Sequence, residues 1–247
     1  MIFDIYTIWR REIIKFSRTR SRIVSSVVMP IVWLTFIGVG LSSSVQLPGV
    51  EYMDFLAPGI VGMIILFTSI FSGVSVIWDR QFGFLKEILV APVSRISIVL
   101  GKTMGGATVA VIHGAIMLAI SSAMGLIPFD SNFAAAFGFM GLTSVCFVSI
   151  GLIIATQMRS MEGFQTIMSF LIMPIFFLSG ALFPIENTPG WMQLASYFDP
   201  LTYGIDGIRN SLGIQGNVPI IANGLVLTGF CVGLIMVGSY LFKRTAI

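Results

Sequence analysis

The feature that most constrains this chain is a series of six long stretches that contain no Asp, Glu, Lys or Arg. A helix rises 1.5 Å per residue and the hydrocarbon core of a bilayer is about 30 Å thick, so about 20 apolar residues cross it. Only 10% of the 247 residues are charged, which is far too few to cover a soluble surface. The chain is therefore predicted to be an all-α polytopic membrane protein with six transmembrane helices. The spans are placed near residues 24–44, 57–78, 100–126, 134–156, 164–183 and 219–242.

The positions of the basic residues predict the direction of these spans. Lys and Arg are enriched on the cytoplasmic side of membrane proteins. Six spans with a cytoplasmic N-terminus put thirteen of the fourteen basic residues inside and only Arg209 outside. Both termini are therefore predicted to be cytoplasmic. Because the basic residues flank membrane segments, nucleic acid is not an expected partner. No cleavable signal peptide is predicted, and residues 1–247 are expected to form a single membrane domain.

Residues 2–20 are predicted to form an amphipathic helix that lies in the membrane interface. Apolar residues recur there at spacings of three and four and share one face, whereas the basic residues fall mostly elsewhere, near anionic lipid. The alternative is a basic flank of the first span that contains some apolar residues. The apolar positions are Ile5, Ile8, Trp9, Ile13 and Phe16, and the basic positions are Arg10, Arg11, Lys15 and Arg18.

The segment between the second and third spans, residues 79–97, also has an amphipathic pattern. Phe82, Leu85, Ile88 and Leu89 share one helical face, and Lys86 and Glu87 point away from its centre. A proline cannot continue a helix, so Pro92 is expected to end this one. A short amphipathic helix between two spans suits docking to another protein, and a turn that follows the membrane surface is the alternative.

About 35 residues, 184–219, are predicted to lie on the outer face. Pro189 and Pro200 interrupt this region, and it is rich in the aromatic rings that favour membrane interfaces. Two short helices that dip back into the membrane would satisfy its backbone if neighbouring spans cover them. The alternative is an ordinary external loop, which would normally carry more charge.

Two patterns resemble catalytic motifs, and neither is predicted to act as one. Gly101, Lys102 and Thr103 end like a nucleotide-binding loop, but Ile96 stands where that loop needs its first glycine. We expect no ATP site on this chain, and we interpret Lys102 as an anchor whose amine reaches the cytoplasmic interface. Ser75 and His113 could suggest an intramembrane serine enzyme. Their positions within their spans, however, differ in depth by roughly 15 Å, whereas a nucleophile and its base approach within about 3 Å.

Other residues in the spans favour packing roles. His113 is interpreted as a packing residue, with the lining of a substrate path as the alternative. Cys146 and Cys231 lie in apolar runs and are expected to pack as small apolar side chains, with no metal site and no catalytic residue predicted. The Gly101–Gly105 and Gly229–Gly233 spacings permit close helix contacts. No ionisable residue is expected at mid-membrane depth, which counts against a self-powered carrier.

Four segments, in order, resemble the membrane subunits of type-2 ABC exporters, the ABC-2 type transporter family. They are residues 55–60 (FLAPGI), 80–95 (RQFGFLKEILVAPVSR), 177–184 (FLSGALFP) and 199–209 (DPLTYGIDGIR). The resemblance covers nearly the whole chain and is strongest to daunorubicin-resistance and nodulation-factor export permeases. One departure is Phe84, where many relatives carry a small polar residue, and it leaves the subfamily and the substrate open.

This resemblance implies an assembly and a set of functional segments. Two permeases, identical or different, would pair in the plasma membrane of a prokaryote, each docked on a cytoplasmic ATPase subunit that binds ATP and Mg. This chain would carry no cofactor and would export an amphipathic drug-, lipid- or glycolipid-like substrate, whereas a self-contained carrier or channel is the alternative. The implied residues that couple this chain to the ATPase are Phe82, Gly83, Leu85, Lys86, Glu87, Leu89, Pro92 and Arg95. The amphipathic helix of residues 2–20 resembles the connecting helix of the family, with Trp9, Arg10, Arg11, Ile13 and Phe16 as its implied residues. The implied residues of the outer re-entrant region are Pro184, Trp191, Asp199, Pro200, Tyr203, Asp206 and Arg209.

Overall fold

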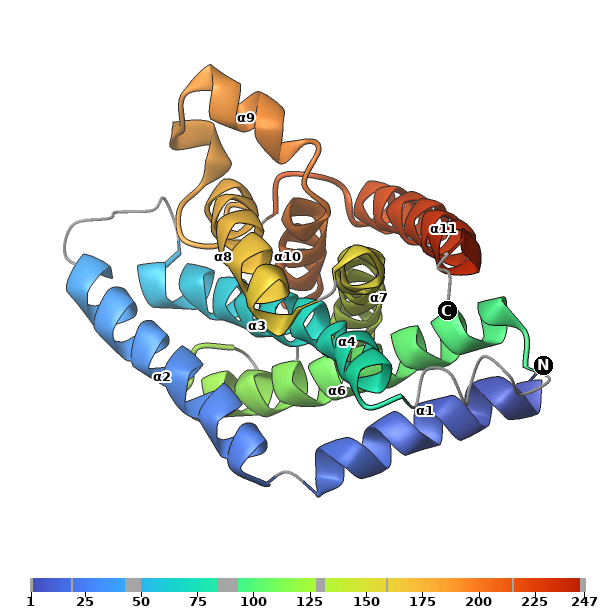
Figure 1. The fold of residues 1–247 in the computed structure, drawn as a ribbon. Coiled ribbons are helices and arrows are strands. Elements are labelled where there is room, and N and C mark those ends of the chain that lie inside the picture. Colours follow the sequence, from blue (N-terminus) through green and yellow to red (C-terminus); the bar gives the residue numbers. More distant parts are fainter. Residues whose placement is uncertain are drawn as a thin grey trace.

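The protein is a bundle of helices. The computed structural model describes residues 2–18, 20–42, 50–83, 93–127, 132–158, 160–214 and 216–244. Within these ranges the regular structure is helical, which confirms the predicted all-α class (Figure 1). The elements are α1 (Ile2–Ser17), α2 (Arg20–Ser42), α3 (Tyr52–Ser72), α4 (Val74–Gln81), α6 (Arg95–Ala123), α7 (Phe133–Gln157), α8 (Met161–Leu178), η1 (Ile185–Asn187), α9 (Gly190–Ser196), α10 (Pro200–Ser211) and α11 (Ile220–Arg244).

The long helices confirm a multi-pass membrane protein. In the described part of the chain, five helical segments are long and apolar enough to cross a bilayer, and a shorter apolar segment, Val28–Ser42, belongs to α2. Each predicted span overlaps one of these segments. The five long segments are Tyr52–Gln81, Arg95–Ala123, Phe133–Gln157, Met161–Leu178 and Ile220–Phe242.

Two helix ends differ from the predicted span boundaries, and local chemistry explains both differences. The fifth span was predicted to reach residue 183, but α8 ends at Leu178 and Gly180 follows with φ of 73°, a conformation that favours glycine. The third span was predicted to begin near residue 100, but α6 begins at Arg95. The Ser94 side chain accepts a hydrogen bond from the backbone N–H of Ser97 and thereby caps the earlier helix start.

The centre of the bundle is formed by α3 and α7. Helix α3 packs against α2, α6, α7 and α10, whereas α7 also contacts α11. Two glycines allow a close approach of backbones here: a Cβ at Gly73, between α3 and α4, would meet the carbonyl of Gly151 in α7, and one at Gly151 would meet the carbonyl of Ile70 in α3. Cys146 of α7 and Cys231 of α11 are buried with their sulfurs 2.9 Å apart, so they fill the contact between these helices, as predicted for packing residues.

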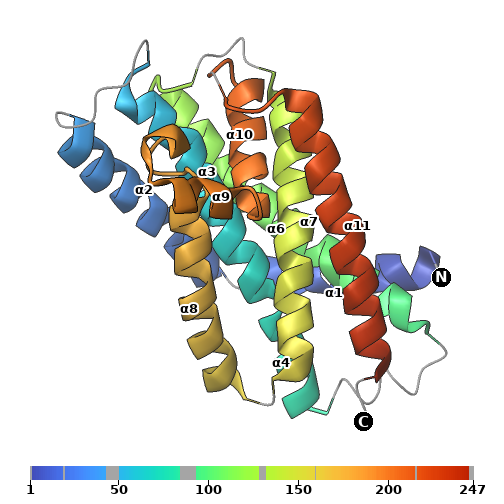
Figure 2. The ribbon, with the colours of Figure 1, turned by 90° about the horizontal axis from the view of Figure 1, so that it is seen from above.

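The region 184–219 contains two short helices, as predicted, and the alternative of an ordinary loop is wrong. Helix α10 is almost completely buried against α3, α7 and α11, whereas α9 exposes Trp191 and Leu194. Figure 2 shows that α10 and α4 lie at opposite ends of the bundle and that α1 runs across the long helices. The two ends therefore carry different functional segments.

Candidate functional site

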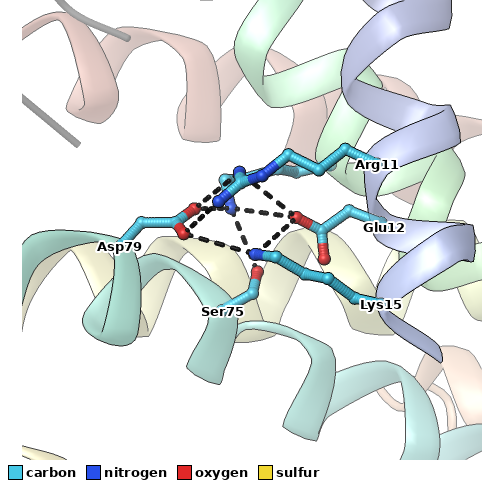
Figure 3. A network of polar contacts seen from close by, with 6 residues as sticks. Arg11, Glu12, Lys15, Ser75 and Asp79 are labelled. Atoms are coloured by element: carbon cyan, nitrogen blue, oxygen red, sulfur yellow. Dashed lines mark hydrogen bonds and ion pairs between the residues drawn. The ribbon is translucent and has the colours of Figure 1, made fainter. Parts of the chain in front are cut away.

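Five charged side chains meet where α1 crosses α4 and α6, and we call this group the junction cluster (Figure 3). Its centre is Asp79, near the end of α4. Arg11 of α1 donates to both carboxylate oxygens of Asp79, over 2.7 Å to Oδ1 and 3.3 Å to Oδ2. Such two-pronged pairing is typical of guanidinium with carboxylate. The members are Arg11, Glu12, Lys15, Asp79 and Lys102.

Lys102 of α6 completes the cluster from the other side. Its Nζ donates to Asp79 Oδ2 over 2.6 Å, to Ser75 Oγ over 3.1 Å and to Glu12 Oε1 over 3.5 Å. Lys15 lies 3.4 Å from Asp79 Oδ1 and 3.7 Å from Glu12 Oε1. Helix α1 is thus joined to α4 and α6, which follow it by more than 50 residues, through two carboxylates.

Burial distinguishes this cluster from ordinary surface ion pairs. The Asp79 side chain is 4% exposed and that of Lys102 is 2% exposed, whereas that of Lys15 is 45% exposed. A buried charge is costly unless it is paired, so removing one partner costs much more than the intact pair contributes. The positions of α1, α4 and α6 therefore depend on one another.

Glycines allow α1 to approach α6 closely enough for this pairing. A Cβ added at Gly101 would lie 2.7 Å from Cβ of Ile8, and one at Gly105 would lie 2.7 Å from Cβ of Glu12. The Trp9 indole N–H also donates to the Thr108 hydroxyl over 3.0 Å. The Gly101–Gly105 spacing therefore serves a helix contact, as its sequence permitted.

Gly101→Ala is expected to lower the free energy of unfolding by about 1–2 kcal/mol. Overpacking against α1 costs about 1–3 kcal/mol, and the higher helix propensity of alanine recovers less than about 1 kcal/mol. Gly229→Ala is the matched control because a Cβ at Gly229 has no atom within 4 Å, so it should be neutral or slightly stabilising. Thermal unfolding of both variants in detergent tests this. Equal changes in unfolding temperature for the two variants would show that the contact between Gly101 and α1 is not tight.

The end of α4 is also joined to α7. Arg80 donates to the backbone carbonyl of Met158 over 2.9 Å and to that of Thr156 over 3.0 Å. These carbonyls belong to the last turn and the cap of α7, where a cation is favourable. Asp79 and Arg80 are adjacent in α4, and together they bind α1, α6 and α7 just before residues 84–92.

The structure places only part of the predicted coupling segment. Phe82 is 82% exposed, Gly83 has φ of 76°, and Arg95 begins α6. The other predicted residues, Leu85, Lys86, Glu87, Leu89 and Pro92, lie outside the described residues, and their role stays a prediction.

The amphipathic helix is confirmed as α1, but two of its basic residues lie in an environment other than the predicted one. Arg11 and Lys15 were expected near lipid, and they turn instead toward Asp79. Of the other predicted residues, Trp9, Ile13 and Phe16 are partly buried and Arg10 is exposed. The interpretation of Lys102 as an interfacial anchor is wrong for the same reason, since its amine is buried in ion pairs.

Sequence reasoning did not identify the cluster itself. Glu12, Asp79 and Lys102 were not among the predicted functional residues. A usable signal was present, because Asp79 and Lys102 are opposite charges at neighbouring ends of consecutive spans. That signal does not specify that α1 supplies the remaining charges.

Ser75 and His113 have separate surroundings, in agreement with the argument against a serine enzyme. The Ser75 hydroxyl accepts from Lys102, whereas His113 Nδ1 lies 3.3 Å from Thr68 Oγ1. The Phe16 ring meets the His113 ring edge-on with centroids 5.1 Å apart. His113 therefore packs between α1 and α3.

A second polar site, centred on Arg209, lies at the end of the bundle that carries α10. Arg209 Nη2 donates to the backbone carbonyls of Phe55 (3.1 Å), Gly180 (2.9 Å) and Ala181 (3.3 Å). Its guanidinium carbon also lies 3.7 Å from the centroid of the Phe55 ring. Three of the segments singled out in the sequence, around residues 55, 180 and 209, thus meet at one side chain.

Asp206, one turn before Arg209, organises the connection from α10 to α11. Its carboxylate accepts from the backbone N–H groups of Asn217 (2.6 Å) and Val218 (3.0 Å), and from the Asn223 side chain (2.7 Å). Asp206 and Arg209 are both about 95% buried. Arg209, predicted as the one basic residue on the outer side, is therefore a structural residue inside the bundle rather than a solvated charge.

The remaining predicted residues of this region have structural positions. Pro184 precedes η1, Trp191 lies exposed on α9, and Tyr203 donates from its hydroxyl to the carbonyl of Tyr197 over 2.9 Å. Pro200 is the first residue of α10, and the Asp199 side chain caps that helix by accepting from the Leu201 N–H over 2.9 Å. Burial raises the pKa of Asp199 to about 8, although the Leu201 N–H acts in the opposite direction.

Fold and sites together define a multi-pass helical membrane protein whose long helices are tied to an amphipathic N-terminal helix by buried charges. The profile of the ABC-2 type transporter family matches residues 4–212, so the chain belongs to this family. The resemblance of the four sequence segments is thereby confirmed, and the chain is an ABC transporter permease.

Individual relatives agree with this assignment. The chain is 30% identical over 206 residues to nodulation protein J of Rhizobium leguminosarum bv. trifolii, covering 82% of this chain and 78% of that protein. It is 28% identical over 248 residues to the inner membrane transport permease YadH of Escherichia coli K12, covering 96% and 94%. A putative transport permease, ycf38 of Pyropia yezoensis, is 28% identical over 219 residues, covering 85% and 74%.

Proposed function

We propose that this chain is the permease subunit of an ATP-driven export complex, with ATP hydrolysed by a separate subunit. The observation that carries the proposal is the position of the junction cluster. It joins α1, α4 and α6 through Asp79, at the start of residues 79–95, the segment that the family resemblance identifies as the contact with the ATPase. A motion imposed there would reach three helices at once through Asp79.

The proposed mechanism is a shift between two conformations. Two permease chains, identical or different, pair, and each docks on a cytoplasmic ATPase subunit that binds ATP with Mg. Closure of the ATPase pair displaces residues 79–95, and the buried charges oblige α1 and α6 to move with α4. ATP supplies the difference in free energy between the two states, and hydrolysis restores the first.

An apolar cavity supports an amphipathic, drug- or lipid-like substrate. It occupies about 330 Å³ between α2, α3 and α8 and is lined by residues such as Trp33, Phe67 and Phe176. Thr68 is a polar residue in the lining of this cavity, and its hydroxyl contacts His113, which lies outside that lining. We therefore propose that His113 affects the substrate path by positioning Thr68.

The proposed location is the cytoplasmic membrane of a prokaryote, with both termini in the cytoplasm. The distribution of basic residues supports this orientation, since the reverse would place thirteen of fourteen outside. The α1 end would then face the ATPase, and α9 and α10 would lie on the outer side. A protease site added after residue 247 should be cut only in inside-out vesicles.

Coupled transport tests the proposal against a self-contained carrier or channel. The chain, co-expressed with its ATPase and placed in liposomes, should export a fluorescent amphiphile only with ATP. Glu87→Ala should weaken association with the ATPase about thirtyfold or more, because truncating a charged interface contact costs about 2 kcal/mol or more. Glu162→Ala, a change in the first turn of α8, serves as the control. Flux driven by an ion gradient without the ATPase would contradict the proposal.

A further inference from the structure

A second apolar groove lies on the other side of α8 from the cavity described above. It occupies about 380 Å³ between α7, α8 and α11, and α9 and the start of α10 contribute to it. Its walls are aliphatic and aromatic, including Phe170 and Pro174 of α8 and Phe230 of α11. This volume is within the usual range for a small-molecule pocket. Figure 2 shows α9 beside the C-terminal end of α8.

One ionisable side chain, Asp199, lies among these apolar walls. Asp199 is 6% exposed, and its Oδ1 already accepts from the Leu201 N–H. The other oxygen, Oδ2, is buried and has no hydrogen-bond partner among the described residues. Leaving such a buried oxygen without a hydrogen bond is unfavourable, so a ligand that bonds to it would recover that cost.

The groove's electrostatics restrict the ligand. Lys, Arg, Glu and His are absent from its described lining, so a phosphate or other anionic headgroup would have no counter-charge there. Since burial raises the pKa of Asp199, the carboxyl is largely protonated at neutral pH and offers an ammonium group little attraction. A hydroxyl satisfies this carboxyl in either protonation state because it both donates and accepts.

We propose that this groove is a binding site for an uncharged membrane amphiphile with a free hydroxyl, such as a diacylglycerol. The apolar body lies between α8 and α11, and the hydroxyl bonds to Asp199 Oδ2. This site is separate from the proposed substrate cavity and does not depend on the direction or energy source of transport. Its occupancy would join α9 and α10 to α8 and α11.

Photolabelling of the full chain in liposomes tests the site. The probes are a photoreactive diacylglycerol and the same molecule with its hydroxyl acetylated. The free hydroxyl form should label peptides 170–178 and 195–200 at least about threefold more strongly than the acetylated form. Asp199→Leu should abolish this preference, whereas Asp199→Asn should keep it because asparagine retains both the helix cap and a hydrogen-bonding group.

A pair of tryptophan variants keeps the test independent of Asp199. Ala195→Trp fills the groove and should remove labelling, whereas Leu194→Trp changes the neighbouring residue of α9, which is 63% exposed and outside the groove lining. Leu194→Trp should label like the unmodified chain, and size-exclusion chromatography checks that each variant is folded. Equal labelling by the two probes, or labelling unaffected by Ala195→Trp, would overturn the proposal and indicate ordinary lipid contact.

Discussion

Asp79→Ala is expected to lower the free energy of unfolding by about 3–5 kcal/mol and to uncouple ATP hydrolysis from transport. The substitution leaves Lys102 buried without its 2.6 Å partner and releases Arg11 of α1. Removing one member of a buried ion pair has a cost of this size because the remaining charge is uncompensated. Chemical unfolding in detergent and transport with the ATPase partner would measure the two effects.

Two control variants give this prediction its specificity. Lys15→Met removes a half-exposed member of the same cluster and should cost less than about 1 kcal/mol. Asp79→Leu combined with Lys102→Met replaces the buried pair by apolar groups and should recover most of the lost stability. If the double variant is stable but does not transport, the charges themselves carry the coupling. A single Asp79→Ala variant as stable as the unmodified chain would contradict the structure of the cluster.

Arg209→Met is expected to lower the free energy of unfolding by about 3 kcal/mol. The variant removes the donor that serves the carbonyls of Phe55, Gly180 and Ala181, and hydrogen bonds of charged groups contribute about 1.5–3 kcal/mol each. The expected loss is smaller than the sum of three such hydrogen bonds because a single nitrogen of Arg209, Nη2, makes all three. Thermal or chemical unfolding in detergent measures the loss.

Two further arginine variants separate charge from geometry. Arg209→Lys keeps the positive charge but not the planar guanidinium that lies over the Phe55 ring, so most of the loss should remain. Arg10→Met, on the exposed side of α1, should change stability by less than about 0.5 kcal/mol. Full stability of Arg209→Lys would mean that charge alone is sufficient at this site.

The family segments acquire a physical explanation from this geometry. Residues 55–60, 177–184 and 199–209 were separate patterns in the sequence. The structure shows that Arg209 bonds to the backbone of the first two. Gly59 is equally constrained, because a Cβ there would meet the carbonyl of Ala181. The resemblance identified which segments matter, whereas the reason for their residues is a tertiary contact.

The sequence by itself determined the class of fold, the approximate position of every long helix, and the amphipathic character of α1. These properties are local, because hydropathy over about 20 residues and the thickness of a bilayer decide them. Helix ends were less certain, since caps such as Ser94 and turns such as Gly180 override hydropathy.

Only the tertiary structure decided which charges are buried and with what partners. Arg11 and Asp79 are separated by 68 residues and Lys102 and Asp79 by 23, so no local pattern specifies their meeting. The pairing exists because glycines let α1 approach α6 closely, and that approach excludes the lipid and water that would otherwise surround these side chains. The same packing converts Arg209 from an apparent surface charge into the residue of α10 that joins α3 to the turn after α8.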